Sequence, residues 1–372
     1  MKIISASGLT TGAAHDKMKN MNSIREVAKQ AGVSTATVSR AFNTPELISA
    51  PTHKRVLEAA DRLNYRPLRA RGRRGDAAPK IAADLNSHAF IGFQFFGANS
   101  ADLPQANPFY APLLAAAQVE AAARGLHLLV HATDRHQLAQ ALPKMIQDQT
   151  VAGMLLVGTA DPEILSVFLE RVPQIVLVDH RDPTRRHDCI VSDGLGGAMA
   201  ATEYLFGLGH ERVAFLRDNP AAVSFQDRLR GFVCAHFEAG RILDPRLVVE
   251  AAGEDDIPRA LAQLLALPDR PTALLAANDR HALAVMSACR TLGLSIPGDL
   301  SLIGFDDIEF SAHTWPPLTT VNIPKAHLGR LAVARLEERL LVPGDSAAAL
   351  LPVTLEVPVS LVVRQSCRSV TK

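Results

Sequence analysis

Cysteine is scarce in this chain of 372 residues. The four cysteines stand at positions 189, 234, 289 and 367, and no close pair indicates a zinc site or a disulfide framework. A reducing compartment, the cytoplasm, is therefore the expected location. No apolar run reaches the length that spans a membrane, and the first 20 residues lack the long apolar centre of a secretory signal. We expect no membrane partner.

The chain also lacks the common catalytic signatures. It has neither the Gly-x-Ser-x-Gly elbow of a nucleophilic serine nor the Gly-x-x-x-x-Gly-Lys-Ser/Thr loop that cradles phosphates. Its 13 histidines show no metal-ligand spacing, and adjacent acids such as Asp306 and Asp307 need not face one substrate. The sequence predicts no enzyme, no metal and no cofactor. Two alternatives for the function of the chain stay open, a cytoplasmic sugar-processing enzyme and a sugar-binding transport component.

Charge is unevenly distributed along a chain whose net charge is +1. Residues 1–75 hold 14 Lys and Arg against 5 Asp and Glu, whereas the remainder holds 25 against 33. A positive head on a negative body suggests that the head meets a polyanion such as DNA. An unevenly charged but merely solvated surface is the alternative. The length suits two or three domains, and the apolar content of 48% supports a large core.

Three short helical patterns occupy residues 22–65. Ser23 and Glu26 have the spacing of a capping box that opens the first helix, and Gly32 ends it. Ser34 leads into the second helix, TATVSRAF, and a third runs from about Ser49 to Asn64 with the apolar stripe Val56, Leu57, Ala60 and Leu63. Two helices joined by so short a turn predict a helix-turn-helix.

The second helix carries small polar side chains and one arginine on its predicted exposed face. A major groove admits such a helix, because Arg40 can reach guanine acceptors while Thr35 and Ala36 allow a close approach to base edges. The alternative is an ordinary three-helix module without a DNA contact.

The stretches IREVAKQAGVSTATVSRAFN, THKRV and NYRP resemble the DNA-binding head of the lactose-repressor (LacI/GalR) family. The resemblance implies that Thr35, Ala36 and Arg40 face bases. It leaves Ser34 and Asn43 as phosphate or capping contacts. Residues 1–21 precede the resemblance and are expected to be a disordered extension, and residues 22–66 form the DNA-binding domain.

A linker of residues 67–88 follows the head and begins PLRARGRRGDAAPK. In the family resembled, the matching stretch forms a hinge helix that places a leucine in the minor groove, and here Arg74 stands at that position. Gly72 and Gly75 would each cost a helix up to about 1 kcal/mol. Either Arg74 enters a narrow minor groove, or the linker with Arg71 and Arg74 binds phosphates flexibly.

Short apolar runs alternate with helical patterns from residue 90 onward. The runs cover 90–96, 126–131, 151–157, 174–179, 212–216, 272–277 and 300–307. Strands of this kind, separated by helices, predict an α/β fold with two parallel sheets covered on both faces. We expect a body at residues 89–365 and a tail at 366–372.

The family resemblance continues through DGLGGAMAATEYLFGLGHERVAFL, RLRGF, AANDRHALAVM, GFDDIEFSAHTWPPLTTV and LVVRQS. It implies a body of two lobes like the periplasmic sugar-binding proteins. The chain would pass between the lobes near Ser192, Val321 and Leu351.

Polar residues that end the apolar runs are candidate ligand contacts, because open α/β sheets bind ligands at the carboxyl ends of their strands. Asp179 ends one run, Asn278 follows another, Asp306 ends a third, and Arg228 on the RLRGF helix offers a fork of donors. The resemblance implies ligand contacts at these four positions. Helix capping is the alternative for Asn278 and Asp306, and we expect Asp279 and Asp307 to be structural.

Aromatic residues before the first body helix offer a second candidate contact. Phe109 or Tyr110 could stack on a ligand ring or pack in the core, and the sequence does not separate these readings. Trp315 is interpreted as a structural residue near a crossing between the lobes.

We therefore predict a ligand-responsive transcriptional regulator, a repressor. It would bind double-stranded operator DNA as a homodimer, with a tetramer as the alternative. Its effector would be a small molecule, a carbohydrate, held between the lobes. Nothing in the sequence decides between inducer and corepressor.

Overall fold

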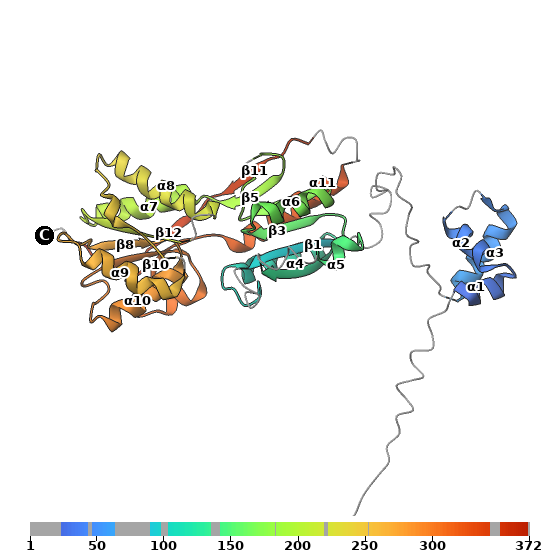
Figure 1. Cartoon of the computed structure of the whole chain (residues 1–372), viewed down its shortest axis with the longest axis horizontal. Coiled ribbons are helices and arrows are strands. Elements are labelled where there is room, and N and C mark those ends of the chain that lie inside the picture. Colours follow the sequence, from blue (N-terminus) through green and yellow to red (C-terminus); the bar gives the residue numbers. More distant parts are fainter. Residues whose placement is uncertain are drawn as a thin grey trace, which may run out of the picture. The chain divides into compact units, whose positions relative to one another are not determined.

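The computed structural model describes residues 24–43, 47–63, 90–97, 103–134, 142–182, 184–218, 222–251, 253–342 and 350–370 (Figure 1). They form two units, a helical head before residue 64 and a body from Phe90 onward. The predicted N-terminal extension and the linker with Arg71 and Arg74 lie outside the described residues, and so do Ser23, Asn64 and Tyr65.

The head consists of three helices around a small core. They are α1 (Ile24–Ala31), α2 (Thr35–Asn43) and α3 (Ala50–Arg62). Gly32 ends α1 with a φ of 64°, a left-handed conformation that glycine adopts without strain. The predicted apolar stripe of α3 needs one correction, because Leu57 is 41% exposed and Ala59 takes its place in the core. The buried side chains are those of Val27, Ala28, Ala31, Val38, Ala41, Val56, Ala59 and Ala60.

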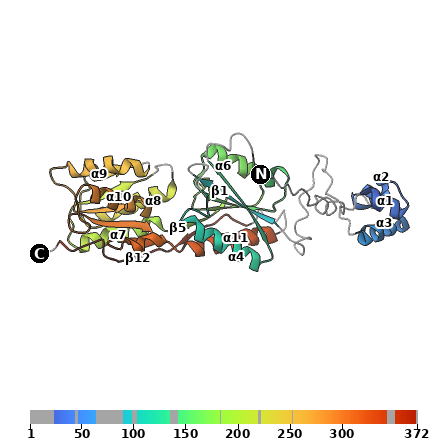
Figure 2. The same cartoon turned by 90° about the horizontal axis from the view of Figure 1, so that it is seen from below.

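The first lobe of the body is built on a parallel sheet in the order β11-β5-β4-β3-β1-β2. Its strands are β1 (Phe90–Gly97), β2 (His127–Asp134), β3 (Met154–Gly158), β4 (Ile175–Val178), β5 (Asp188–Ser192) and β11 (Thr354–Val357). Helices α4 (Tyr110–Ala123) and α11 (Lys325–Leu341) pack together on one face (Figure 2). The opposite face is covered by α5 (Lys144–Gln147) and α6 (Pro162–Arg171).

The second lobe repeats this plan with the strand order β12-β10-β9-β8-β6-β7, in which only β12 runs antiparallel to its neighbour. Its strands are β6 (Val213–Arg217), β7 (Val248–Glu250), β8 (Ala273–Ala276), β9 (Ser301–Asp306), β10 (Thr319–Asn322) and β12 (Ser360–Val362). Helices α7 (Gly194–Gly207) and α8 (Val223–Glu238) cover one face, and α9 (Ile257–Leu265) and α10 (Asp279–Thr291) cover the other.

The predicted fold class is confirmed, and all seven predicted apolar runs form strands. Five strands were not predicted, namely β5, β7, β10, β11 and β12. Each has five residues or fewer and contains at least one polar residue, so none forms the continuous apolar run by which equally short strands such as β4 were predicted.

The chain passes between the lobes at three places. β5 leads into α7 after Ser192, and β10 leads into α11 between Asn322 and Lys325, as predicted. The third crossing was expected near Leu351 but lies at residues 358–359, because β11 still pairs with β5 of the first lobe while β12 pairs with β10 of the second.

The segment from Ser366 to Val370 was predicted to be a tail and instead belongs to the second lobe. Ser366 is fully buried and accepts the backbone N–H of Thr319 at 2.8 Å. The N–H of Val370 donates to the carbonyl of Leu208. The body therefore extends at least to Val370.

Candidate DNA-reading helix and ligand cleft

The exposed face of α2 carries the three residues predicted to contact bases. Thr35, Ala36 and Arg40 are exposed, whereas Val38 and Ala41 on the opposite side are buried in the head. The hydroxyl of Ser34 accepts the N–H of Thr37 at 3.1 Å, so this serine caps α2. Asn43 is the last residue of α2, and its side chain lies outside what the structure describes.

At the rim of the first lobe, Asp179 follows β4 directly. Its φ of 57° is unusual for a residue other than glycine. The hydroxyl of Tyr110, at the start of α4, donates to Oδ2 of Asp179 at 2.7 Å. Burial raises the pKa of Asp179, and the Tyr110 hydrogen bond and the charge of Arg228 counteract this rise in part. The Tyr110 hydroxyl thus fixes the orientation of the Asp179 carboxylate.

At the rim of the second lobe, Arg228 of α8 forms a buried ion pair with Asp306 at the end of β9. Nη2 of Arg228 donates to Oδ1 of Asp306 at 3.0 Å, and Nη1 donates to the carbonyl of Ala277. The guanidinium lies 4.0 Å from the ring centroid of Phe305, and its Nε has no hydrogen-bond partner. Burial raises the pKa of Asp306 to about 6, although the charges of Arg228 and Lys325 oppose this.

Both polar groups of the Asn278 side chain form hydrogen bonds within the protein. Its oxygen accepts the N–H of His281 at 2.8 Å and caps α10, and its amide donates to Oδ2 of Asp218 at 2.7 Å. Capping was the alternative to ligand contact for Asn278, and the structure shows that capping. A ligand that bound this amide would have to share it with Asp218.

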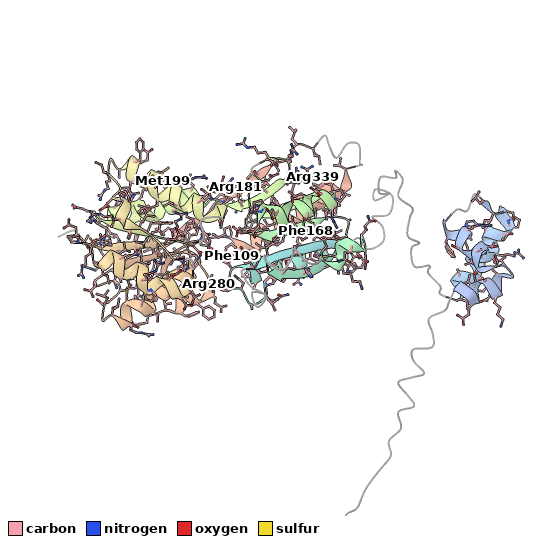
Figure 3. The ribbon with its side chains drawn as sticks, in the orientation of Figure 1. Phe109, Phe168, Arg181, Met199, Arg280 and Arg339 are labelled. Atoms are coloured by element: carbon pink, nitrogen blue, oxygen red, sulfur yellow. The ribbon has the colours of Figure 1, made fainter. Side chains whose placement is uncertain are left out.

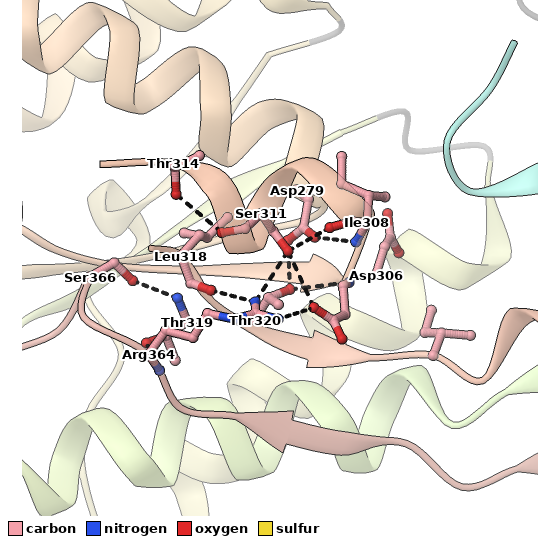
Figure 4. A network of polar contacts seen from close by, with 12 residues as sticks. Asp279, Asp306, Ile308, Ser311, Thr314, Leu318, Thr319, Thr320, Arg364 and Ser366 are labelled. Atoms are coloured by element: carbon pink, nitrogen blue, oxygen red, sulfur yellow. Dashed lines mark hydrogen bonds and ion pairs between the residues drawn. The ribbon is translucent and has the colours of Figure 1, made fainter. Parts of the chain in front are cut away.

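Asp279 belongs to a polar network beneath the rim (Figure 4), and Asp307 joins it through Ser311 and Arg364, so both have the structural contacts expected for them. Asp279 is fully buried and accepts from the N–H of Ile308 at 2.9 Å and from the hydroxyl of Thr320 at 2.6 Å. Asp307 pairs with Arg364 at 2.6 Å. Burial and, after it, the charge of Asp306 raise the pKa of Asp279 to about 7.

Lys325 stands at the second crossing and faces the carbonyl groups that end β9. Its buried Nζ donates to the carbonyl oxygens of Asp306, Asp307 and Ile323. Burial lowers the pKa of Lys325, whereas the charges of the nearby aspartates raise it. The lysine therefore joins the start of α11 to the rim of the second lobe.

Phe109 and Tyr110 take different positions. Phe109 is 9% exposed and belongs to the hydrophobic core, where its ring meets the Tyr110 ring edge-on at 4.8 Å. Tyr110 also packs edge-on against Phe95, yet its hydroxyl reaches Asp179. Core packing thus describes Phe109, whereas the hydroxyl of Tyr110 lies at the rim of the first lobe, bonded to Asp179.

A small cavity of about 10 Å³ lies where the lobes meet, with room for about one water molecule. Arg181, which Figure 3 labels near this junction, is one of its lining residues. The others are Asp179, His180, Val191, Ser192, Val223, Ser224 and Asp227. His180 contributes a buried Nδ1 without a hydrogen-bond partner. This cavity is too small for a sugar or a purine base.

Sequence reasoning missed three groups at this site. Asp218 directly follows β6 and could have been found by the rule that selected Asp179. Lys325 and the pair Arg181–Asp227 carry no comparable signal, because their roles depend on which elements the crossings bring together.

A helix-turn-helix head with an exposed reading helix, joined to a hinged two-lobed body, defines a ligand-binding transcriptional regulator. Residues 23–67 match the family model described as bacterial regulatory proteins, lacI family, and residues 202–367 match that of a periplasmic binding protein-like domain. The chain belongs to the lacI family. It is therefore a DNA-binding regulatory protein with a ligand-binding body, and not an enzyme.

Relatives and solved structures agree with this assignment. The chain is 33% identical to the HTH-type transcriptional repressor PurR of Aliivibrio fischeri strain ES114 over 334 residues, which cover 86% of this chain and 92% of that protein. PurR of Pasteurella multocida strain Pm70 is 29% identical, with coverage of 94% and 99%.

Two solved structures match over nearly the whole chain. A complex of the transcriptional regulator CelR with cellobiose is 27% identical, with a TM-score of 0.66 and coverage of 92% of this chain and 99% of that one. The lac repressor dimer bound to operator and the anti-inducer ONPF is 25% identical, with a TM-score of 0.63 and coverage of 93% and 99%.

Among the described residues, no helix has the length and apolar character needed to cross a bilayer.

The raised pKa of Asp279 predicts how stability depends on pH. Between its unfolded pKa near 3.8 and its folded pKa of about 7, the folded protein binds more protons than the unfolded chain at this group. The contribution of Asp279 to the free energy of unfolding therefore falls as pH rises through that window. We expect a lower melting temperature at pH 8 than at pH 6, and a smaller difference in Asp279→Asn. If the melting temperature differed as much between pH 6 and pH 8 in the variant as in the unchanged protein, the raised pKa of Asp279 would be contradicted.

Proposed function

We propose that this protein is a repressor that binds a two-fold operator as a homodimer in the cytoplasm. A small ligand rich in hydroxyl groups, a carbohydrate, would bind between the lobes and set the affinity for DNA. The observation that carries the proposal is the combination of an exposed reading helix with a rim of paired polar side chains at the crossings between the lobes.

The chemistry of the rim supports a neutral ligand with several hydroxyl groups. Asp179 in the first lobe and Asp306 in the second are close enough for the charge of Asp179 to raise the pKa of Asp306. Carboxylates accept hydrogen bonds from hydroxyl groups, and Arg228 supplies donors. An anionic ligand would meet these carboxylates at a cost.

The backbone at the rim also supports a ligand-binding role. Asp179, Asp306 and Asp307 have φ values of 57°, 115° and 51°, in a region that favours glycine. Such conformations cost about 1–3 kcal/mol each and cluster at functional sites, where the surrounding fold maintains them.

A thermal-shift panel tests the ligand. Cellobiose is the first probe, because a similar structure is a cellobiose complex, and purine bases, nucleosides, free sugars and sugar phosphates complete the panel. A ligand that binds only the folded state at about 100 times its Kd stabilises it by about 2.7 kcal/mol and raises the melting temperature. Asp179→Asn should abolish this rise, whereas Asp161→Asn, an exposed control at the start of α6, should retain it. A panel without any shift would argue against the carbohydrate proposal.

DNA recognition is tested at α2 and in the linker. Arg40→Ala should relax base preference at one operator position and cost about 1–3 kcal/mol of binding free energy there. Arg71→Ala should weaken binding to all DNA sequences alike and reduce the salt dependence of binding, because it would remove a phosphate contact. Selection from randomised operators measures the first effect, and affinities at several salt concentrations measure the second. Equal losses on all sequences for Arg40→Ala would remove its role as a base contact.

An exposed surface of the second lobe supports self-association. Trp315 was interpreted as a structural residue, yet it is 93% exposed. It stands beside a groove of about 680 Å³ whose lining includes Leu283, Met286, Leu294 and Ile296. A protruding indole next to a groove lined in part by apolar side chains allows a two-fold contact, in which each subunit fills the groove of the other.

Replacement of this indole tests the homodimer. Trp315→Ser should shift the sedimentation coefficient toward that of a monomer and weaken operator binding, because a dimer combines the phosphate contacts of two heads. Phe237→Ser serves as the control, since Phe237 is 80% exposed on α8 and outside this groove. Equal sedimentation of Trp315→Ser and the unchanged protein would place the dimer contact elsewhere.

A further inference from the structure

A chain of three ion pairs joins the lobes beside the small cavity. Arg181 lies in the first lobe, just after β4, and its Nε donates to Oδ2 of Asp227 on α8 at 3.1 Å. Figure 3 labels Arg181 near the place where the lobes meet. This bond connects the lobes through side chains and not through the crossings of the backbone. Both residues also line the cavity next to Asp179.

Each charge of this interlobe pair has a second partner within its own lobe. Nη2 of Arg181 donates to Oε1 of Glu356 on β11 at 3.0 Å, and Oδ1 of Asp227 accepts from Nη1 of Arg230 on α8 at 2.8 Å. The two bonds of Arg181 use different nitrogens, and the two bonds of Asp227 use different oxygens. All three ion pairs therefore exist together when the lobes are in contact.

This arrangement determines the free-energy cost of breaking the Arg181–Asp227 bond when the lobes separate. When one partner of a buried ion pair is removed, the remaining charge is left without compensation, and that is costly. Here the bond between Arg181 and Asp227 can break while Glu356 still compensates Arg181 and Arg230 still compensates Asp227. The side chain of Arg181 is 31% exposed and that of Asp227 is 11% exposed, so water can also solvate the separated charges. The bond can thus open and close at low cost.

We propose that Arg181 and Asp227 form a reversible latch that sets the balance between open and closed lobes, with Glu356 and Arg230 as the partners that receive the two charges on opening. Removal of either latch residue favours the open state. Removal of Glu356 or Arg230 favours the closed state, because a charge that has lost its partner within the lobe is compensated only across the gap. The functional meaning of the latch rests on the proposed ligand response, but the lobe balance itself requires neither ligand nor DNA.

The experiment measures lobe separation in the full chain without ligand. Spin labels are attached at Glu163→Cys on α6 and Gln263→Cys on α9, two exposed positions in different lobes. The half-buried Cys234 and Cys367 are replaced by alanine and serine, while Cys189 and Cys289 are buried. Labelled protein is diluted with unlabelled protein, so that distances within one chain dominate the signal in double electron–electron resonance spectroscopy.

Arg181→Gln and Asp227→Asn should each raise the ratio of open to closed populations about two- to fivefold, the range expected for a partly exposed ion pair. The double variant should show no further rise, because either substitution alone already removes the bond. Glu356→Gln and Arg230→Gln are matched controls that neutralise charges in the same chain of ion pairs, and they should lower the ratio.

The latch is overturned if Arg181→Gln and Asp227→Asn leave the distances unchanged, if their effects add in the double variant, or if Glu356→Gln opens the lobes as far as Asp227→Asn does. Circular dichroism verifies the fold of each variant. If a latch variant fails to fold, the unsubstituted latch provides the test, because about 0.5 M salt in place of 0.05 M should raise the open population by screening the pair. A salt-independent population would overturn the latch. None of these readouts requires the ligand proposal to be correct.

Discussion

The ion pair between the buried guanidinium of Arg228 and Asp306 is the interaction on which the rim of the second lobe depends. A charge with 3% exposure is tolerated only when it is compensated, and here Asp306, the carbonyl of Ala277 and the ring of Phe305 provide that compensation. Because these partners stand at the ends of two strands, the pair holds α8 against the rim of the second sheet. Asp179 of the first lobe lies within the field of this pair, so the polar groups of both lobes influence one another.

Lys325 extends the same principle to the backbone. Its ammonium group binds the carbonyl oxygens at the end of β9, from which the chain continues toward the second crossing. The rim of the second lobe is thereby tied to Lys325, the first residue of α11, and α11 packs against α4 in the first lobe. If the ligand binds at this rim as proposed, these contacts give a physical route by which its binding can alter the arrangement of the body.

Much of this architecture could be predicted from the sequence, because apolar runs such as the one that became β4 differ clearly from their surroundings. The short edge strands could not, since a run of three residues such as β7 has no measurable period. The third crossing was misplaced for the same reason. Among the site residues, those that end apolar runs were found, and the local pattern also indicated the cap that Asn278 forms. The bond of Asn278 to Asp218 and the bond between Arg181 and Asp227 arise from tertiary contacts that no local pattern records.

The three crossings have a consequence for how the body is assembled. The first lobe receives its last helix and an edge strand, α11 and β11, only after the chain has built most of the second lobe. The second lobe in turn obtains its edge strand, β12, from the last part of the chain. Neither lobe is a continuous piece of polypeptide, so no single cut yields either one whole. Both sheets can therefore be completed only after β11 and β12, in residues 354–362, have been synthesised.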